Sequence, residues 1–216
     1  MKKTTILMVS MAAVFLFTAS CDRSHLQQAQ VPVQPGDSEL DREIRRVMEK
    51  GINLEERKKQ VPAIAAAFSK KTDPQRARWL AALCYLKTLG TPFMPMDMAE
   101  IALAETGEHG LSGKAVSVKG AAGVWQLMPF RAKTHGYSRK DLEDDEKCAE
   151  AAVRELLTKV AMAKGDLVKA KKLYCGVGPQ ADAYEVRRRQ FRKQILEEMA
   201  KLSKKKEAQS TIAQAL

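Results

Sequence analysis

The spacing of apolar residues is the feature that most constrains the fold of this chain. Leu40, Ile44 and Val47 recur at intervals of three to four residues until Gly51 interrupts them. This is the period of a helix with one buried face, and no segment of useful length alternates apolar and polar residues as a half-buried strand does. The sequence therefore predicts an all-α fold, and ~165 residues are ample for a single hydrophobic core.

Apolar residues and capping signals place the other helices. Ile64 and Phe68 predict one core helix, and the Asp73-Pro74 pair predicts the start of the next. In that second helix a buried face is expected at Trp79, Leu83 and Leu86. Further helices are expected from residue 97 toward 108, then over 144–164, 167–174 and 184–202.

The N-terminus has the organisation of an export signal. Lys2 and Lys3 precede an apolar run over 6–17 that is short for a membrane-spanning helix. The run ends in "FTASC", which resembles the lipobox of bacterial lipoproteins, with Thr18 where that pattern usually has Leu. The resemblance implies a signal peptide over 1–20, lipidation at Cys21 and a membrane-anchored lipoprotein that faces the periplasm of the bacterial envelope. The alternative is ordinary secretory cleavage, which would leave Cys21 as a free thiol.

Composition predicts a tether after the signal and a basic end to the chain. Residues 21–37 are rich in Gln and Pro and have no apolar period, as flexible linkers do. The chain carries a formal net charge of +11, and residues 187–206 contain nine basic and two acidic side chains. Export removes nucleic acid as a partner, so the basic segment is either a solvated helix face or a surface for anionic phospholipid or wall polymer.

Cysteine and histidine usage does not indicate a metal or another cofactor. The three histidines are scattered and no CxxC pattern is present, so neither a metal site nor a cofactor is expected. After Cys21 the chain has Cys84, Cys148 and Cys175, which allow at most one disulfide. Any of the three pairings is open from the sequence alone.

One glutamate stands out for its position on a predicted helix. Ile101, Ala104 and Glu108 lie at i, i+3 and i+7, which would place the Glu108 carboxyl on the apolar face at the helix end. Burial there would raise its pKa toward neutrality, as a general acid requires. The competing interpretation is a solvated glutamate at a helix C-terminus.

The segment after this glutamate carries a family resemblance. "AVSVKGAAGVWQLMP" is close to the pattern AVSxxGAxGLxQxMP of the soluble (SLT) type of lytic transglycosylase domain, which has a lysozyme-like fold, and Glu108 precedes Gln126 by eighteen residues. The segments "HGYSRKDLEDDEKCAEAAVRELL", "KKLYCGVGPQADAY" and "YEVRRR" extend the resemblance more weakly, over about residues 95–195. We therefore expect an additional N-terminal helical module over 38–90, a catalytic domain over 91–203 and a basic tail over 204–216.

The resemblance implies both an activity and a set of site residues. Glu108 would be the catalytic acid and base, whereas Ser117, Gln126, Met128 and Tyr174 would contact substrate. The substrate would be peptidoglycan, cut between N-acetylmuramic acid and N-acetylglucosamine without water, to leave 1,6-anhydro ends. Most glycosidases use two carboxyl groups, but here the substrate's acetamido group would replace the second.

Three positions depart from the family pattern. His109 follows Glu108 where the family usually has Ser, whereas Cys175 and Cys148 stand where it tends to have Asn. Two alternatives therefore stay open: a non-catalytic peptidoglycan-binding lipoprotein with a degenerate cleft, and a hydrolytic lysozyme-like muramidase. Because Cys148 and Cys175 both replace residues that flank the family's cleft, we also expect them to be neighbours that an oxidising compartment could link.

Overall fold

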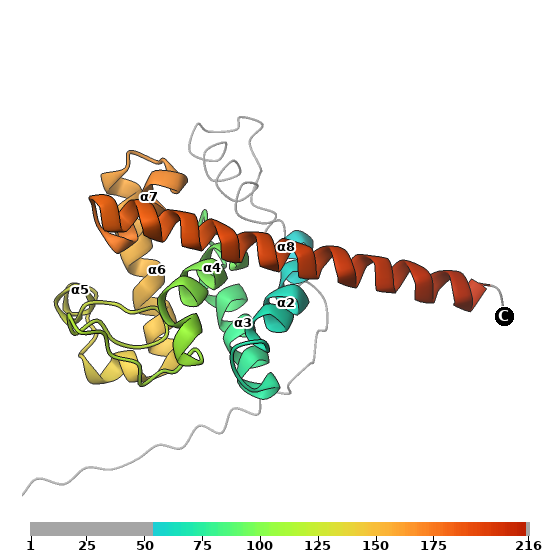
Figure 1. Ribbon diagram of the computed structural model, residues 1–216. Coiled ribbons are helices and arrows are strands. Elements are labelled where there is room, and N and C mark those ends of the chain that lie inside the picture. Colours follow the sequence, from blue (N-terminus) through green and yellow to red (C-terminus); the bar gives the residue numbers. More distant parts are fainter. Residues whose placement is uncertain (1–53, 215–216) are drawn as a thin grey trace, which may run out of the picture. The chain divides into compact units, whose positions relative to one another are not determined.

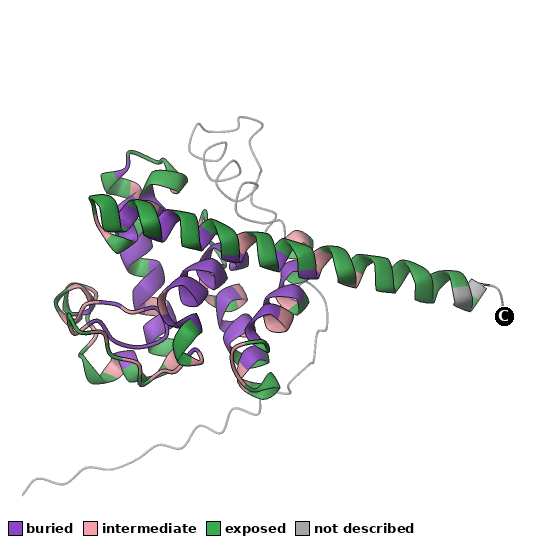
Figure 2. Cartoon of the chain, viewed as in Figure 1, coloured by how far each residue is buried: buried purple, intermediate pink, exposed green. Residues whose placement is uncertain are grey.

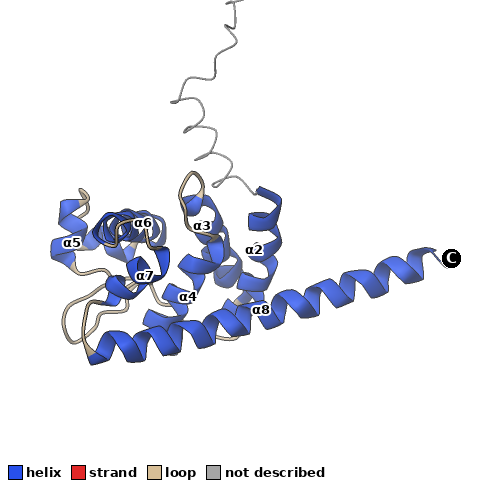
Figure 3. Cartoon of the chain, turned by 90° about the horizontal axis from the view of Figure 1, so that it is seen from above, coloured by secondary structure: helices blue, strands red, loops and turns tan. Residues whose placement is uncertain are grey.

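The computed structural model describes residues 54–214, and this part of the chain contains helices and loops but no strand (Figures 1 and 3). The predicted all-α class is thus confirmed. The α-helices are α2 (Leu54–Phe68), α3 (Pro74–Thr88), α4 (Pro95–Thr106), α5 (Pro129–Thr134), α6 (Asp145–Met162), α7 (Leu167–Cys175) and α8 (Pro179–Gln214). Two short 3₁₀ helices, η1 (Gly107–His109) and η2 (Lys140–Glu143), interrupt the loops.

All of the described residues belong to one compact unit. The predicted signal peptide, lipidation site, tether and first amphipathic helix all lie outside the described residues. Among the described helices, none is both long enough and apolar enough to cross a bilayer.

Helix α4 lies at the centre of the core. Almost all of its residues are buried, including Met98, Ile101 and Leu103, so the helix is covered on every side (Figure 2). Helices α2, α3 and α8 pack against it, and α8 also runs along α2 and α7. A helix surrounded by others has a fixed position, and α4 is therefore a rigid support for any side chain at its C-terminal end.

Helices α2 and α3 share the core with α4. Ile64 and Phe68 are fully buried, as expected, but the predicted buried face of α3 is wrong at Trp79 and Leu86, which are 46% and 50% exposed. The residues of α3 that face the core are mostly smaller, namely Ala77, Leu80, Ala81, Leu83 and Cys84. Helical periodicity cannot choose between two apolar stripes on one helix, and α3 buries the stripe that includes its alanines.

The capping signals mark two helix starts correctly, whereas the last helix is longer than predicted. The Asp73 carboxylate accepts hydrogen bonds from the backbone N–H groups of Gln75 (3.0 Å) and Arg76 (2.9 Å), and Asp144 caps α6. Helix α8 spans Pro179–Gln214 rather than 184–202, so the predicted start of a separate tail at 204 falls inside it. The Lys, Glu, Ala and Gln residues there are good helix formers and contain no breaker.

Candidate active site

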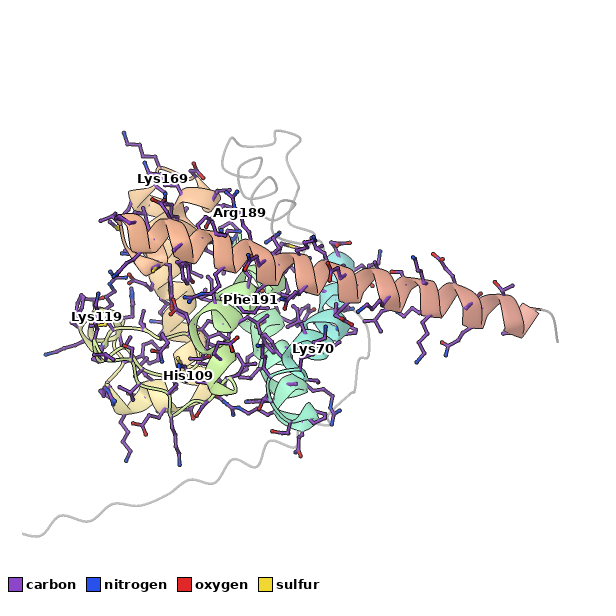
Figure 4. All side chains as sticks on the ribbon, in the orientation of Figure 1. Lys70, His109, Lys119, Lys169, Arg189 and Phe191 are labelled. Carbon is purple, nitrogen blue, oxygen red and sulfur yellow. The ribbon has the colours of Figure 1, made fainter. Side chains whose placement is uncertain are left out.

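A pocket of about 270 Å³ opens beside the C-terminal end of α4. Its wall is formed by α4, η1 and the loop that follows, and among residues 54–214 Glu105 is the only acidic side chain that lines it. The lining residues are Glu105, His109, Ser112, Lys114, Ala115, Val116, Ser117 and Gln126. Figure 4 shows His109 and Lys119 on the side of the fold that carries this loop.

Glu105 has the electrostatic properties of a general acid. It is partly buried in the last turn of α4, and burial raises the pKa of its carboxyl to about 7. The Arg187 guanidinium and the Tyr184 hydroxyl, both from α8, act in the opposite direction and lower this pKa. A carboxyl group of this kind is largely protonated just below neutral pH and can both donate and accept a proton.

Two buried tyrosines lie near Glu105. The Tyr174 hydroxyl donates a hydrogen bond to the backbone carbonyl of Trp125 (2.8 Å), while Glu105 and burial together raise the pKa of Tyr174. The Tyr184 hydroxyl is buried and makes no hydrogen bond of normal geometry, although it is close enough to Glu105 to lower the pKa of that carboxyl. Tyr174 was predicted to contact substrate, and the structure places it close enough to Glu105 for the charge of that carboxyl to act on it.

Glu108 does not have the buried carboxyl predicted for it. Helix α4 ends at Thr106, so Glu108 lies in η1 and its side chain is 77% exposed. The Lys71 ammonium donates a hydrogen bond to its Oε1 (2.9 Å) and lowers its pKa. The expected raised pKa is therefore wrong for Glu108, and it is found three residues earlier, at Glu105.

The apolar period of the sequence also indicates Glu105, although the family motif led to the assignment of Glu108. Glu105 lies four residues after Ile101 and seven after Met98, so it continues the same apolar period as well as Glu108 does. The decisive difference is where the helix ends, and helix boundaries are poorly marked in sequence. Tyr184 was missed because only packing of α8 brings it to the end of α4.

The glycine-rich loop, which joins η1 to α5, forms the second wall of the pocket. The Ser117 hydroxyl accepts a hydrogen bond from the Ala121 N–H (3.0 Å), and the Gln126 side-chain amide donates to the carbonyls of Ala115 (3.0 Å) and Gly123 (2.8 Å). Gln126 has a φ of +48°, a left-handed conformation that costs a residue other than glycine free energy and is found most often at functional sites. Ser117 and Gln126 thus line the pocket that contains Glu105.

Gly123 allows this loop to pack tightly against η2 and α6. A Cβ atom at Gly123 would lie 2.1 Å from the Leu142 carbonyl oxygen and 2.6 Å from the Cys148 Sγ. Any side chain at Gly123 would therefore prevent this close approach. Cys148 and Cys84 are buried, Cys175 is exposed, and all three are free thiols, so the expected link between Cys148 and Cys175 is not formed.

The remaining predicted contact residue and a second hollow lie outside this pocket. Met128 is the N-cap residue of α5 and does not line the pocket of Glu105. A larger hollow of about 520 Å³ lies along α5, where Phe130 and Tyr137 contribute aromatic surface, but no acidic side chain lines it. Within residues 54–214, no group of three metal-ligating side chains is placed to bind an ion.

Comparison with known proteins identifies the domain that holds this pocket. Residues 96–197 match the family model of the transglycosylase SLT domain. This segment is similar to SLT domains. Members of this family are lytic transglycosylases that act on peptidoglycan. No curated protein and no solved structure matches the chain at a significant level. The SLT domain begins within α4 and contains Glu105, the glycine-rich loop and Tyr184, whereas α2 and α3 precede it.

Proposed function

We propose that this protein is a peptidoglycan lytic transglycosylase and that Glu105 is its general acid and base. The observation that carries the proposal is the position of Glu105 as the only carboxyl group in the pocket, with a pKa raised to about 7. Glycoside hydrolases generally need two carboxyl groups on opposite sides of the bond, so a single one favours a reaction in which the substrate supplies the second group.

The reaction begins with the Glu105 carboxyl in its protonated form. It donates its proton to the oxygen that leaves from N-acetylmuramic acid, while the acetamido group of that sugar stabilises the positive charge at the anomeric carbon. Glu105, now a carboxylate, accepts the proton of the C6 hydroxyl. That oxygen then attacks the anomeric carbon to form the 1,6-anhydro ring, and no water is consumed.

The other residues of the pocket position the glycan. Ser117 and Gln126 contribute polar groups to the wall opposite α4, and Gln126 uses its amide N–H groups to hold the loop. Among the described residues no hydrogen bond to the Gln126 side-chain oxygen is found, so this oxygen can accept one from a sugar hydroxyl or acetamido N–H. Tyr174 orders the glycine-rich loop through the hydrogen bond that its hydroxyl donates to the Trp125 carbonyl.

Assigning the acid to Glu105 also removes one departure from the family pattern. The residue that follows it is Thr106, which bears a hydroxyl as the family's serine does, instead of His109. The Thr106 hydroxyl donates to the Val124 carbonyl (2.8 Å) and so ties the end of α4 to the glycine-rich loop. The spacing to Gln126 becomes twenty-one residues, which adds three residues to the loop between them.

The experiment is digestion of purified peptidoglycan by the wild type and two matched variants. Glu105→Gln retains size and polarity but cannot deliver a proton, so we expect kcat to fall about 10²–10⁴-fold with glycan binding retained. Glu108→Gln removes only an exposed carboxylate, so we expect at most a twofold change. Mass analysis of the wild-type products should show 1,6-anhydro ends.

Other outcomes would assign a different function. Reducing ends would identify a hydrolytic muramidase, and binding without cleavage would identify a wall-binding protein. If Glu108→Gln is inactive and Glu105→Gln is active, the acid is Glu108, as the sequence motif first indicated.

The proposal includes a membrane anchor at Cys21, which lies outside the described residues. It is supported by the short apolar run and the small residues before Cys21. Such an anchor would hold the enzyme at the envelope membrane while the tether over 21–37 gives it reach toward the wall. We expect labelled fatty acid to be incorporated by the wild type and not by Cys21→Ser, and the variant should leave the membrane fraction.

A further inference from the structure

Arg76 makes a set of contacts that have no part in the proposed reaction. It lies on α3, which precedes the SLT domain, and its guanidinium is partly buried between the glycine-rich loop and α6. The Nε and Nη2 atoms donate to the Leu111 carbonyl oxygen at 3.1 and 2.7 Å. The Nη1 and Nη2 atoms donate to the two carboxylate oxygens of Asp145 at 2.7 and 2.9 Å.

These contacts fix the first residues of the pocket wall. Leu111 is fully buried and has a φ of +52°, a conformation that persists only where the surroundings impose it. Immediately after it, a Cβ atom at Gly113 would lie 2.8 Å from the Asp145 carboxylate and 2.9 Å from the Glu143 carbonyl. The backbone at Gly113 therefore passes through a narrow space bounded by the Arg76–Asp145 pair and the Glu143 carbonyl.

The wall of the pocket begins at this point. Ser112, Lys114, Ala115 and Ser117 line the pocket directly after Leu111. The Ala115 carbonyl accepts hydrogen bonds from the Gly123 N–H (3.0 Å) and from the Gln126 side chain (3.0 Å). A displacement of Leu111 would thus be transmitted through Ala115 to Ser117 and Gln126, the two polar residues proposed to face the glycan. Glu105 lies in the last turn of α4, which Leu111 contacts through the hydrogen bond from its N–H to the Thr106 carbonyl (3.0 Å).

We propose that Arg76 is a positioning residue that sets the glycan-binding wall of the pocket from outside the SLT domain. It acts through Leu111 and Asp145 and does not itself touch the sugar. Its role requires the planar guanidinium, because a lysine ammonium cannot bond the carbonyl and both carboxylate oxygens in this geometry. The kinetic part of this proposal rests on the proposed function, and the structural part does not.

Two variants of the full chain test it, with a control on the same helix. Arg76→Lys keeps the charge, Arg76→Ala removes the side chain, and Arg78→Ala removes an exposed arginine two residues away. We expect both Arg76 variants to accelerate hydrogen exchange of the 110–117 segment about tenfold, and Arg78→Ala to leave it unchanged. On soluble glycan strands we expect KM to rise about tenfold in the Arg76 variants, while kcat and its pH profile change less than about threefold.

The two readouts separate the failure of this proposal from the failure of the proposed function. If the wild type cleaves no glycan, the proposed function fails and hydrogen exchange alone decides the role of Arg76. Unchanged exchange of the 110–117 segment in both Arg76 variants would overturn the proposal. So would an unchanged KM in active variants whose only defect is a lower midpoint of unfolding, because that is the behaviour of a purely structural contact.

Discussion

The Tyr184 hydroxyl is the only buried side-chain polar atom without a hydrogen bond of normal geometry among the residues that the structure describes. A buried hydroxyl in that state costs free energy unless something occupies its bonding direction. Its proximity to Glu105 lowers the pKa of that carboxyl, while the Arg187 guanidinium lies 5.9 Å from the Tyr184 ring. Tyr184 therefore tunes the proposed acid.

A prediction for the pH profile follows at the residue scale. Glu105 must be protonated to act as an acid, so the wild-type rate should fall as the pH rises through about 7. In Tyr184→Phe one of the two groups that lower this pKa is lost while Arg187 remains, so the alkaline limb of the kcat/KM profile should move to higher pH. The rate at pH 5 should fall less than about tenfold, since the carboxyl itself remains.

The kcat/KM profiles of the wild type and of Tyr184→Phe, measured between about pH 4 and 9, will check this prediction. Tyr85→Phe, on α3, is a suitable control for the loss of a phenolic hydroxyl. A limb that moves to lower pH in Tyr184→Phe would contradict the assignment of Tyr184.

The sequence could predict most of the candidate site but not its central residue. Ser117 and Gln126 follow from the motif, because their spacing within the glycine-rich segment is fixed by local chain geometry. The proposed acid could not be placed from the sequence, because two glutamates three residues apart both match an apolar period and only the end of α4 distinguishes them. Tyr184 approaches through long-range packing, which one sequence does not encode locally.

At the scale of elements, buried charges join α4 to α7 and α8. Glu100 is fully buried and accepts hydrogen bonds from Arg188 and from Arg192 (3.1 Å), and Lys171 on α7 pairs with both Glu100 (3.3 Å) and Asp97. Burial of charge is costly, and pairing compensates for it only while every partner is present. This cluster fixes the register of α8 on α4, and hence the position of Tyr184.

Removal of one partner should be strongly destabilising. We expect Glu100→Ala to lower the free energy of unfolding by about 3–5 kcal/mol, because Arg188 is left buried without its main counter-charge. Urea denaturation followed by circular dichroism measures the difference. The control is Glu197→Ala on the exposed side of α8, where a change within about 0.5 kcal/mol is expected. A loss below about 1 kcal/mol for Glu100→Ala would show that the cluster does not hold α8.

The helices themselves were largely predictable, and the errors have physical causes. Capping residues such as Asp73 and Asp144 act locally, so the starts of α3 and α6 can be read from sequence. The buried face of α3 could not be read, since it depends on which helices surround it. The length of α8 was underestimated because its last turns contain too few apolar residues to show a helical period, although nothing in the sequence stops the helix there.

At the scale of the whole molecule, the hydrophobic core extends beyond the SLT domain. Ile64, Phe68 and Leu80 belong to the same cluster of buried residues as Phe93 and Met98. A fragment limited to residues 96–197 would expose the apolar surface that α2 and α3 cover. The N-terminal helices are therefore part of the folding unit that holds the pocket, and not an addition that can be removed without cost.

Two truncations should behave in opposite ways. The 96–197 fragment should show no cooperative thermal transition, because several fully buried side chains would lose their partners. Deletion of 205–216 removes residues that are exposed at 205–211 and 213, so the free energy of unfolding should change by less than about 0.5 kcal/mol. Thermal unfolding followed by circular dichroism distinguishes the two, and a stable 96–197 fragment would contradict the shared core.

The exposed thiol of Cys175 gives the pocket a chemical reporter. Cys84 and Cys148 are buried, and burial raises the pKa of both thiols, that of Cys148 to about 12, so within residues 54–214 an alkylating reagent should reach Cys175 first. Burial and the charge of Glu105 raise the pKa of the Cys175 thiol, whereas Lys119 lowers it. Its alkylation rate follows the thiolate fraction of Cys175, so ionisation of the neighbouring carboxyl should slow the rise of that rate as the pH passes about 7, without any substrate.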